Sequence, residues 1–377
     1  MRKLKKFFIA KSLTLLSAAE LMFNIVPLTV TAEDERSDVF YDDFSDSCLD
    51  TDKWLIAEKN WGGTVTSDGV KQDYNGGVIA ENVALRDGTL VLTGLGNSYR
   101  GKLRGINRDK SRRADGMRCG GAIATKDYFG SGSYEIRAKI APELGCCSAM
   151  WTFEYEEKYS GDDVSIVNHE IDIEFPGRDE NDELSLSHAL CTTWIGEGGN
   201  EHKTAVPYCG DQADGEFHTY RFDWHTGSDS EIPRVEYYFD GVLTYTSYEF
   251  IPTNESRFWL GLWFPKNWAG TPDFDRTEFV VDHVSITPFH ESGDTPQHES
   301  YPDSGWAEQL RGDVDSDGSF DTADLVLLQK WLLGISDTKL KNWRNADFCK
   351  DGRLDSLDLC IMRRELVSST SYSGDNV

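Results

Sequence analysis

The stretch Glu170-Ile171-Asp172-Ile173-Glu174 decides the fold class, because acidic and apolar side chains alternate along it with a period of two. In an extended strand, successive side chains point to opposite faces. The three carboxylates therefore line one face. The two isoleucines, followed by Phe175, line the other face and can pack into a core. The pattern predicts a β-strand whose acidic face is open and whose apolar face is buried.

Three like charges on one strand face are costly unless they bind or react with something. The Cα atoms of Glu170 and Glu174 should lie about 13 Å apart in a strand, and their side chains can lean toward each other. Carboxyls about 5–5.5 Å apart are typical of glycosidases that retain anomeric configuration, against about 6.5–9.5 Å in inverting enzymes. Asp172 can share a proton with a neighbour and tune its pKa. The alternative is a solvated acidic face without chemistry.

Many short strands are expected around this stretch. Alternating runs at residues 133–140, 234–239 and 279–286 are separated by turns rich in Gly, Asp and Asn. Asp240-Gly241 between two such runs is a strong hairpin signal. Residues 38–289 are long enough for one large core. The pattern predicts an all-β, antiparallel sandwich.

The same region resembles glycoside hydrolase family 16. The motifs that carry the resemblance are GSYEIRAK at 132–139, HEIDIEFPG at 169–177, FHTYRFDW at 217–224 and YFDG at 238–241. The resemblance implies a β-jelly-roll sandwich whose concave sheet forms the cleft. It also implies that Glu170 is the nucleophile, Asp172 its helper and Glu174 the general acid/base. The motif has no extra residue between Asp172 and Glu174, as in lichenases and xyloglucan-active members rather than laminarinases and agarases.

Aromatic faces pack well against sugar rings, so several aromatic residues are candidate substrate platforms. They are Trp151, Tyr155, Trp194, Trp263 and Trp268, with Trp194 first and Trp151 second. Packing in the core is the alternative for each of them. His188 is a candidate hydrogen-bond partner of the substrate, with a structural role as the alternative. The family resemblance assigns Asp282 to a structural calcium site.

Export is indicated at the start of the chain. Residues 1–32 combine a basic start, an apolar stretch and a small-residue cleavage site at Val30-Thr31-Ala32, which is typical of a signal peptide. Lys11 and Glu20 interrupt the apolar stretch, which argues against a membrane-spanning helix. The net charge of −27 over 377 residues argues against nucleic acid and anionic membranes as partners.

The eight cysteines leave disulfide pairing open. An exported protein can form disulfides, but sequence does not give their connectivity. Cys191 and Cys209 bracket a loop and are one candidate pair, and Cys349 with Cys360 is another. Reduced cysteines that pack as small hydrophobic residues are the alternative.

Residues 313–324 and 347–358 form an internal repeat. Oxygen ligands at loop positions one, three, five, nine and twelve, with Gly at six, match the spacing of a calcium loop. The candidate ligands are Asp313, Asp315, Asp317, Asp321 and Asp324 in the first loop, and Asp347, Asp351, Asp355 and Asp358 in the second. Cys349 replaces the third-position ligand of the second loop, so this site is expected to be weaker. Each loop leads into a helical stretch.

This duplicated loop-helix unit resembles a type I dockerin, a small α-helical module. The resemblance implies two structural calcium ions and a cohesin partner on a scaffold protein, contacted by Thr322-Ala323 and Ser356-Leu357. A calcium-sensing EF-hand is the alternative, but it requires a helix before each loop. The expected organisation is a signal peptide at 1–32, a sandwich at 38–289, a linker at 290–308, a dockerin at 309–367 and a disordered tail at 368–377.

Together these features predict an extracellular, retaining endo-β-glucanase that cleaves mixed-linkage β-1,3-1,4-glucan and docks onto a cellulosome. No metal or organic cofactor is expected in the chemistry. Within the same family, a laminarin- or xyloglucan-active hydrolase or a transglycosylase is the alternative. A non-catalytic carbohydrate-binding sandwich is an alternative of a different class.

Overall fold

The computed structural model describes residues 38–59, 77–96, 118–160, 163–178, 181, 183–197, 201–228, 230–265, 269–270, 272–297, 306–307, 310–349 and 352–371. For residues 155–160, 163–166, 197 and 368–371 the description covers the backbone alone. The expected signal peptide, Tyr155 as a side chain, Trp268 and Asp351 therefore lie outside it. No helix in the described part of the chain has the length and apolar character needed to cross a membrane.

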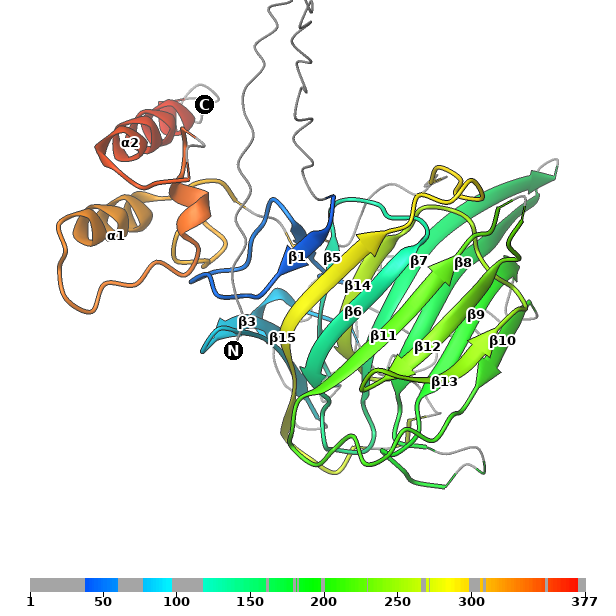
Figure 1. Cartoon of the computed structure of the whole chain (residues 1–377). Helices are drawn as coiled ribbons and strands as arrows, with labels where there is room; N and C mark the ends of the chain where they lie inside the picture. Colours follow the sequence, from blue (N-terminus) through cyan, green and yellow to red (C-terminus); the bar gives the residue numbers. More distant parts are fainter. Residues whose placement is uncertain are drawn as a thin grey trace, which may run out of the picture. The chain divides into compact units, whose positions relative to one another are not determined.

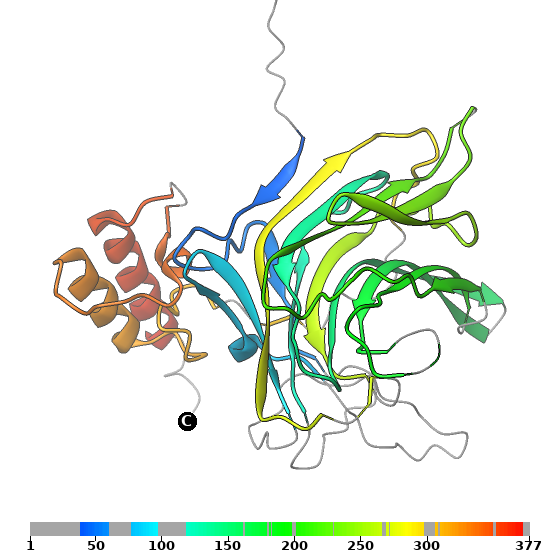
Figure 2. The same cartoon turned by 60° about the horizontal axis from the view of Figure 1, so that its bottom comes forward.

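Two antiparallel sheets form a sandwich, seen as two curved layers (Figures 1 and 2). The larger sheet has the order β13-β12-β11-β6-β15-β4-β3, with β1 also paired to β15. Its strands are β1 (Phe40–Asp42), β3 (Val83–Arg86), β4 (Thr89–Leu95), β6 (Gly132–Lys139), β11 (His218–His225), β12 (Arg234–Phe239), β13 (Val242–Ser247) and β15 (Arg276–Pro288). A short 3-10 helix, η1 (Ala80–Asn82), precedes β3.

The second sheet has seven strands in the order β10-β9-β8-β7-β14-β5-β2. Its strands are β2 (Trp54–Ile56), β5 (Gly121–Thr125), β7 (Cys147–Ser160), β8 (Asp163–Phe175), β9 (Leu190–Glu197), β10 (His202–Ala205) and β14 (Arg257–Trp263). The acidic stretch lies on β8, which pairs with β7 and β9 without a break in register. The antiparallel all-β sandwich expected from the sequence is confirmed.

The core lies between the two sheets. Ile171, Ile173 and Phe175 on β8 are at most 3% exposed and pack there with Trp224 and Tyr134 of the larger sheet. The period-two pattern thus places the apolar face of β8 inward, and its acidic face turns away from the core.

The expected hairpin at Asp240-Gly241 is confirmed, and it joins β12 to β13. Both residues have positive φ, 49° and 76°. A two-residue turn with positive φ at both positions matches the right-handed twist of the flanking strands. The carboxylate of Asp240 also accepts a hydrogen bond from the backbone of Thr219 at 2.9 Å.

The C-terminal module contains two loop-helix units. Its elements are α1 (Thr322–Leu332), η2 (Trp343–Ala346) and α2 (Ser356–Ser371). Val314 and Phe348 occupy the second position of their respective loops and are buried together with Leu328 and Met362. The internal repeat in the sequence is therefore an internal repeat in the packing.

The helix α2 continues to Ser371, four residues into the stretch 368–377 that the sequence predicts as a tail. Met362 and Leu366 anchor this helix by burial. Serine costs less than about 0.7 kcal/mol relative to alanine in a helix, so an anchored helix can extend through a serine-rich stretch.

All eight cysteines lie within the described residues, and the structure joins none of them in a disulfide. The candidate pairs Cys191–Cys209 and Cys349–Cys360 are therefore not formed. Cys191 is fully buried in the sandwich core, where it packs as a small hydrophobic residue.

Candidate active site and calcium loops

The three carboxylates of β8 lie on the outer face of the seven-stranded sheet. Strand register places Asp172 beside Trp151 on β7, and Glu170 beside Trp194 on β9. The exposed fraction of Asp172 is 4%, whereas Glu170 and Glu174 are half-buried and keep contact with solvent. The strand thus offers two accessible carboxyls with a buried one between them.

Burial raises the pKa of each of these three carboxyl groups. For Glu170, desolvation acts first and the nearby charge of Glu174 second. The pKa of Asp172 is raised by burial and then by the charge of Glu170, and that of Glu174 by burial and then by the charge of Asp172. Three crowded carboxyls cannot all be ionised at neutral pH, so the group retains protons.

Hydrogen bonds distinguish the roles of the three groups. Glu170 accepts from the side-chain amide of Asn168 at 3.3 Å. A hydrogen bond between the two carboxyls lowers the pKa of Glu170 and raises that of Asp172. The Nε1–H of Trp194 donates to Oδ2 of Asp172 at 2.9 Å. The contact between the two carboxyls thus favours charge on Glu170 over charge on Asp172.

Glu174 has a different neighbour. The Sγ atom of Cys147 lies 3.8 Å from its Oε1, within range of a weak S–H donor. Burial raises the pKa of the Cys147 thiol well above its usual value, so the sulfur keeps its proton. Glu174 therefore combines a raised pKa with solvent contact, the properties of a general acid.

Aromatic rings flank the carboxylates on both sides. The ring of Trp194 stacks on His202 of β10, with centroids 4.2 Å apart. The ring of Trp151 stacks on Trp259 of β14, with centroids 5.5 Å apart. Trp151 is only 5% exposed. Most of its surface is therefore covered by neighbouring side chains, as in the packing alternative to a substrate platform.

The two C-terminal loops share one hydrogen-bond pattern. In the first, Gly318 donates its backbone N–H to Asp313 at 2.9 Å, and Asp321 donates to Asp324 at 2.9 Å. In the second, Gly352 donates to Asp347 at 2.8 Å, and Asp355 donates to Asp358 at 3.0 Å. In both loops, the backbone N–H of position six donates to the carboxylate of position one. The backbone N–H of position nine donates to the carboxylate of position twelve.

The donor sets of the loops fit calcium. Carboxylate oxygens of Asp313, Asp315 and Asp317 lie within 4.8 Å of one another. In the second loop the group is Asp347, Cys349 and Asp358, at loop positions one, three and twelve. Calcium takes oxygen ligands, so the first loop offers the harder donor set.

Comparisons with known proteins agree with both parts of the chain. Residues 95–281 match the family model "Glycosyl hydrolases family 16". The chain carries a family 16 glycosyl hydrolase domain. Residues 311–367 match the model "Dockerin type I domain", so a type I dockerin follows the family 16 domain.

The relatives of the family 16 domain include β-glucanases. A beta-glucanase of Acetivibrio thermocellus is 30% identical over 227 residues, which cover 58% of this chain and 61% of that protein. The endo-1,3-1,4-beta-glycanase ExoK of Rhizobium meliloti is 29% identical over 254 residues, or 66% of this chain and 78% of that protein. A lichenase structure from a mouse hindgut metagenome has a TM-score of 0.48 and 23% identity, covering 67% of this chain and 99% of the other.

The structure brings Asn168, Cys147, His202 and Trp259 to the carboxylate face of the family 16 domain, although the sequence analysis did not select them. Asn168 had a usable signal, since it lies two residues before Glu170 and so shares its face. Cys147, His202 and Trp259 come from other strands of the same sheet, and no local pattern indicates their place on this face.

Three further sequence candidates lie as follows. His188 lies before β9 and contacts Ser185, with its Nδ1 3.2 Å from the hydroxyl, and the ring of Tyr208. Trp263 ends β14 and packs against the cluster that contains Trp151 and Trp259. Thr322, Ala323, Ser356 and Leu357 are all exposed at the starts of α1 and α2.

The carboxylate of Asp282 lies 3.1 Å from the guanidinium of Arg137 and 3.0 Å from Nδ1 of His283. These contacts do not test a calcium-binding role for Asp282, and that role stays a prediction.

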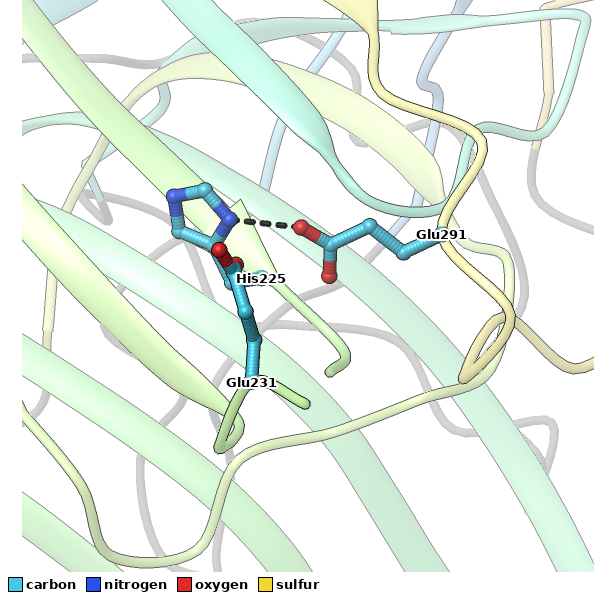
Figure 3. A group of neighbouring side chains, drawn as sticks. All are labelled: His225, Glu231 and Glu291. Atoms are coloured by element: carbon cyan, nitrogen blue, oxygen red, sulfur yellow. Dashed lines mark hydrogen bonds and ion pairs between the residues drawn. The ribbon is translucent and has the colours of Figure 1, made fainter. Parts of the chain in front are cut away.

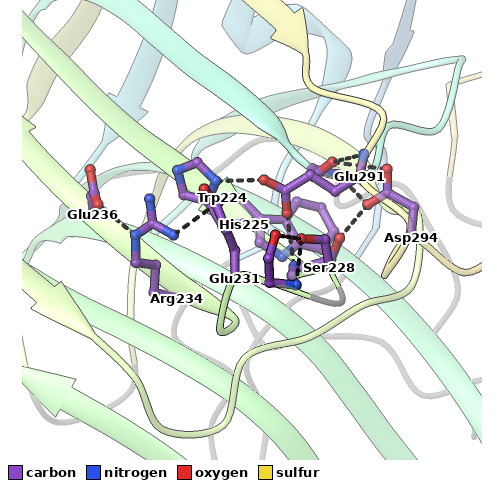
Figure 4. Close-up of polar contacts among 12 residues, drawn as sticks. Trp224, His225, Ser228, Glu231, Arg234, Glu236, Glu291 and Asp294 are labelled. Atoms are coloured by element: carbon purple, nitrogen blue, oxygen red, sulfur yellow. Dashed lines mark hydrogen bonds and ion pairs between the residues drawn. The ribbon is translucent and has the colours of Figure 1, made fainter.

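A second acidic group lies on the larger sheet. His225, Glu231 and Glu291 place one ligand atom each within 4.8 Å (Figure 3). Nδ1 of His225 is 2.7 Å from Glu291, and the other oxygen of Glu291 accepts from the backbone of Gly227 at 2.8 Å. Arg234 lies beside Glu231 at 3.7 Å (Figure 4). These donors satisfy the carboxylates, and the group is a hydrogen-bond network.

This network holds the chain that follows β15 against the sandwich. Asp294 accepts from the backbone and hydroxyl of Ser131 at 2.8 and 2.9 Å, and from Thr226 at 2.8 Å (Figure 4). Thr295 then pairs through its backbone with Thr253 and Glu255. The described residues at the start of the expected linker thus contact the family 16 domain, while the domain boundaries themselves stay predictions.

Proposed function

We propose that the chain is an exported, retaining endo-β-glucanase that cleaves mixed-linkage β-1,3-1,4-glucan and is held on a scaffold protein through its dockerin. One observation carries the chemistry: β8 presents two accessible carboxyls, Glu170 and Glu174, around the buried Asp172. Hydrogen bonds favour charge on the first, and burial favours a proton on the second.

The first half of the reaction uses both glutamates. Glu170 attacks the anomeric carbon, while Glu174 gives its proton to the leaving glycosidic oxygen, so the carbon–oxygen bond breaks and a glycosyl ester forms. Asn168 and Asp172 orient the attacking carboxylate through their hydrogen bonds. The Nε1–H of Trp194 in turn holds Asp172.

The second half reverses the proton transfer. Glu174, now ionised, takes a proton from a water molecule as that water attacks the anomeric carbon. The ester bond breaks and Glu170 leaves as a carboxylate. Two displacements at one carbon return the β configuration. These steps use no metal ion or organic cofactor.

The choice of mixed-linkage glucan is supported by β8 itself and by the named relatives. The register of β8 with both neighbours is unbroken, so no bulge separates Asp172 from Glu174. In the resemblance described above, this spacing belongs to lichenases and xyloglucan-active members. The R. meliloti relative is named as an endo-1,3-1,4-beta-glycanase.

Docking is supported by the dockerin match and by the exposure of residues at the helix starts. We expect calcium to be held by Asp313, Asp315, Asp317, Asp321 and Asp324 in the first loop, and by Asp347, Asp351, Asp355 and Asp358 in the second. Bound calcium would neutralise these carboxylates and fix the loops. The helix starts would then face a cohesin.

The test is product release from barley mixed-linkage glucan, laminarin and xyloglucan by the intact chain and by Glu170→Ala. We expect oligosaccharides from mixed-linkage glucan, a loss of more than about a thousandfold in the variant, and a product that first appears as the β anomer by NMR. The matched control is Glu135→Ala, a half-buried glutamate on β6 of the other sheet, which should keep activity.

Other outcomes overturn defined parts of the proposal. Activity on laminarin or xyloglucan alone would keep the mechanism and change the substrate. An α anomer as the first product would exclude double displacement. Binding of glucan without products, unchanged by Glu170→Ala, would indicate a carbohydrate-binding sandwich.

A further inference from the structure

Three tryptophans form a continuous stack on the carboxylate face of the family 16 domain. Asp172, Trp151 and Trp259 are aligned in register across β8, β7 and β14. The ring of Trp259 then stacks on Trp306, with centroids 5.0 Å apart and planes inclined by 27°. Trp306 lies outside residues 95–281 and within the stretch that the sequence predicts as a linker.

Backbone contacts hold Trp306 in place. Trp306 pairs with Ala57 in an antiparallel bridge, and the N–H of Ala307 donates to the carbonyl of Ile56 at 2.8 Å. Ile56 ends β2, the edge strand of the seven-stranded sheet. This short piece of the linker therefore continues the sheet past its edge, and its indole is ordered before any ligand arrives.

A cationic side chain borders the same stack. The ammonium group of Lys59 lies 4.6 Å from the ring centre of Trp259 and 5.4 Å from that of Trp306. The cation is attracted to the ring faces and helps to fix both indoles. Its N–H donors also provide polar groups beside an aromatic surface, the combination that sugar sites use.

Exposure separates Trp306 from the other two rings. Trp151 and Trp259 are 5% and 4% exposed, whereas Trp306 is half-buried and keeps contact with solvent. Trp306 is thus the ring of this stack with the most surface available to a ligand. Its indole lies about 15 Å from β8, because the ring spacings of 5.5 and 5.0 Å add to one strand spacing of about 5 Å. An extended polymer can span this distance.

From this arrangement we propose that Trp306 is a specificity-determining residue, which contacts a distant part of a bound glucan chain and favours long substrates over short ones. The inference rests on the proposed function of the family 16 domain. It assigns part of the polysaccharide-binding surface to the linker.

The experiment uses the full chain with Trp306→Ala and Trp306→Phe. We expect Trp306→Ala to raise KM for barley β-glucan roughly three- to tenfold, as expected for the loss of one aromatic contact. Its kcat, and its kcat/KM on a short aryl glycoside, should stay unchanged. Trp306→Phe should restore most of the affinity. The matched control is Trp331→Ala, a 42% exposed tryptophan on α1 of the dockerin.

A second variant tests the anchoring of the ring. Ala307→Pro removes the N–H that reaches Ile56 but keeps the indole. It should weaken binding of the polymer nearly as much as Trp306→Ala. Circular dichroism melts identify any variant that has lost its fold.

Binding is also measured in a Glu170→Ala background by gel retardation in β-glucan, which does not require turnover. If the parent chain cleaves no glucan, the proposed function fails whatever Trp306 does. If the parent cleaves glucan and Trp306→Ala binds it equally well, the inference alone is wrong. Tighter binding or faster cleavage by Trp306→Ala would also overturn it, because the indole would then cover the surface.

Discussion

At the scale of single residues, the carboxyls of β8 differ by the donors that surround them. Glu170 accepts from Asn168, Asp172 from Trp194, and Glu174 has the thiol of Cys147 beside it. Three carboxyls on one strand face thus have three different hydrogen-bond environments. Burial supplies the common upward shift in pKa, and each neighbour adjusts it.

The pH dependence of stability follows from this shift. Burial raises the pKa of Glu170 from 4.5 to about 8. The folded state then binds its proton more tightly than the unfolded state, so stability falls as pH rises from about 4.5 to about 8. We expect Glu170→Gln to unfold at a higher temperature than the parent at pH 8, and at a similar temperature at pH 4. Calorimetric melts across this range test the prediction, and a constant difference would contradict it.

The thiol of Cys147 should tune the acid. Its hydrogen bond lowers the pKa of Glu174 against the dominant effects of burial and nearby charge. Cys147→Ala should therefore raise that pKa and move the alkaline limb of kcat/KM to higher pH, while Cys147→Ser keeps a donor and most of the parental profile. Cys146→Ala, a buried cysteine in the core between the sheets, is the control. If the alkaline limb of kcat/KM does not shift in Cys147→Ala, the thiol contributes packing alone.

At the scale of elements, the two calcium loops share their backbone pattern and differ in one ligand. Cys349 stands where the first loop has Asp315, and its sulfur lies 3.7 Å from a carboxylate oxygen of Asp347. Both units thus have the same loop geometry. The second loop, however, has a soft sulfur where the first has a hard oxygen donor.

Restoring the oxygen ligand should strengthen the second loop. We expect Cys349→Asp to tighten one of two calcium-binding steps by roughly tenfold, because ligand charge sets affinity in such loops. Titration calorimetry measures both steps. Cys360→Asp adds the same charge on the exposed face of α2 and should leave both steps unchanged. Equal effects of the two substitutions would point to a general charge effect.

At the scale of the whole molecule, the proposed catalysis and the proposed docking depend on different groups. The proposed chemistry uses carboxyls of β8, whereas the dockerin gathers at least three acidic side chains around its first loop. Without a cation, like charges in that loop repel one another and oppose folding of the unit.

Calcium removal should therefore separate the two functions. We expect a chelator to reduce helical circular dichroism and abolish cohesin binding, while the initial rate on β-glucan stays within about twofold of its value with calcium. Added calcium should restore binding, and added magnesium should not. A parallel loss of hydrolysis would show that the sandwich also depends on a metal ion.

Much of this organisation was predictable from the sequence. The alternation at residues 170–175 determined the face that carries each side chain of β8, since side-chain direction in a strand follows a period of two. Asp240-Gly241 determined a hairpin, because both positions tolerate the positive φ that the turn requires. The spacing of acidic residues and glycines predicted two similar loops, since the candidate ligands of each come from one short segment.

Tertiary structure decided what surrounds these local features. Cys147 and Trp194 reach the β8 carboxylates from strands that are separate in sequence, and His202 stacks on Trp194 from a third. These contacts exist only once strand order and register are set. Trp306 reaches the same sheet from a polar stretch whose local sequence favours no element. The local sequence pattern around a residue fixes the direction of its side chain. The residues that it contacts on other strands depend on long-range strand pairing, which no local pattern encodes.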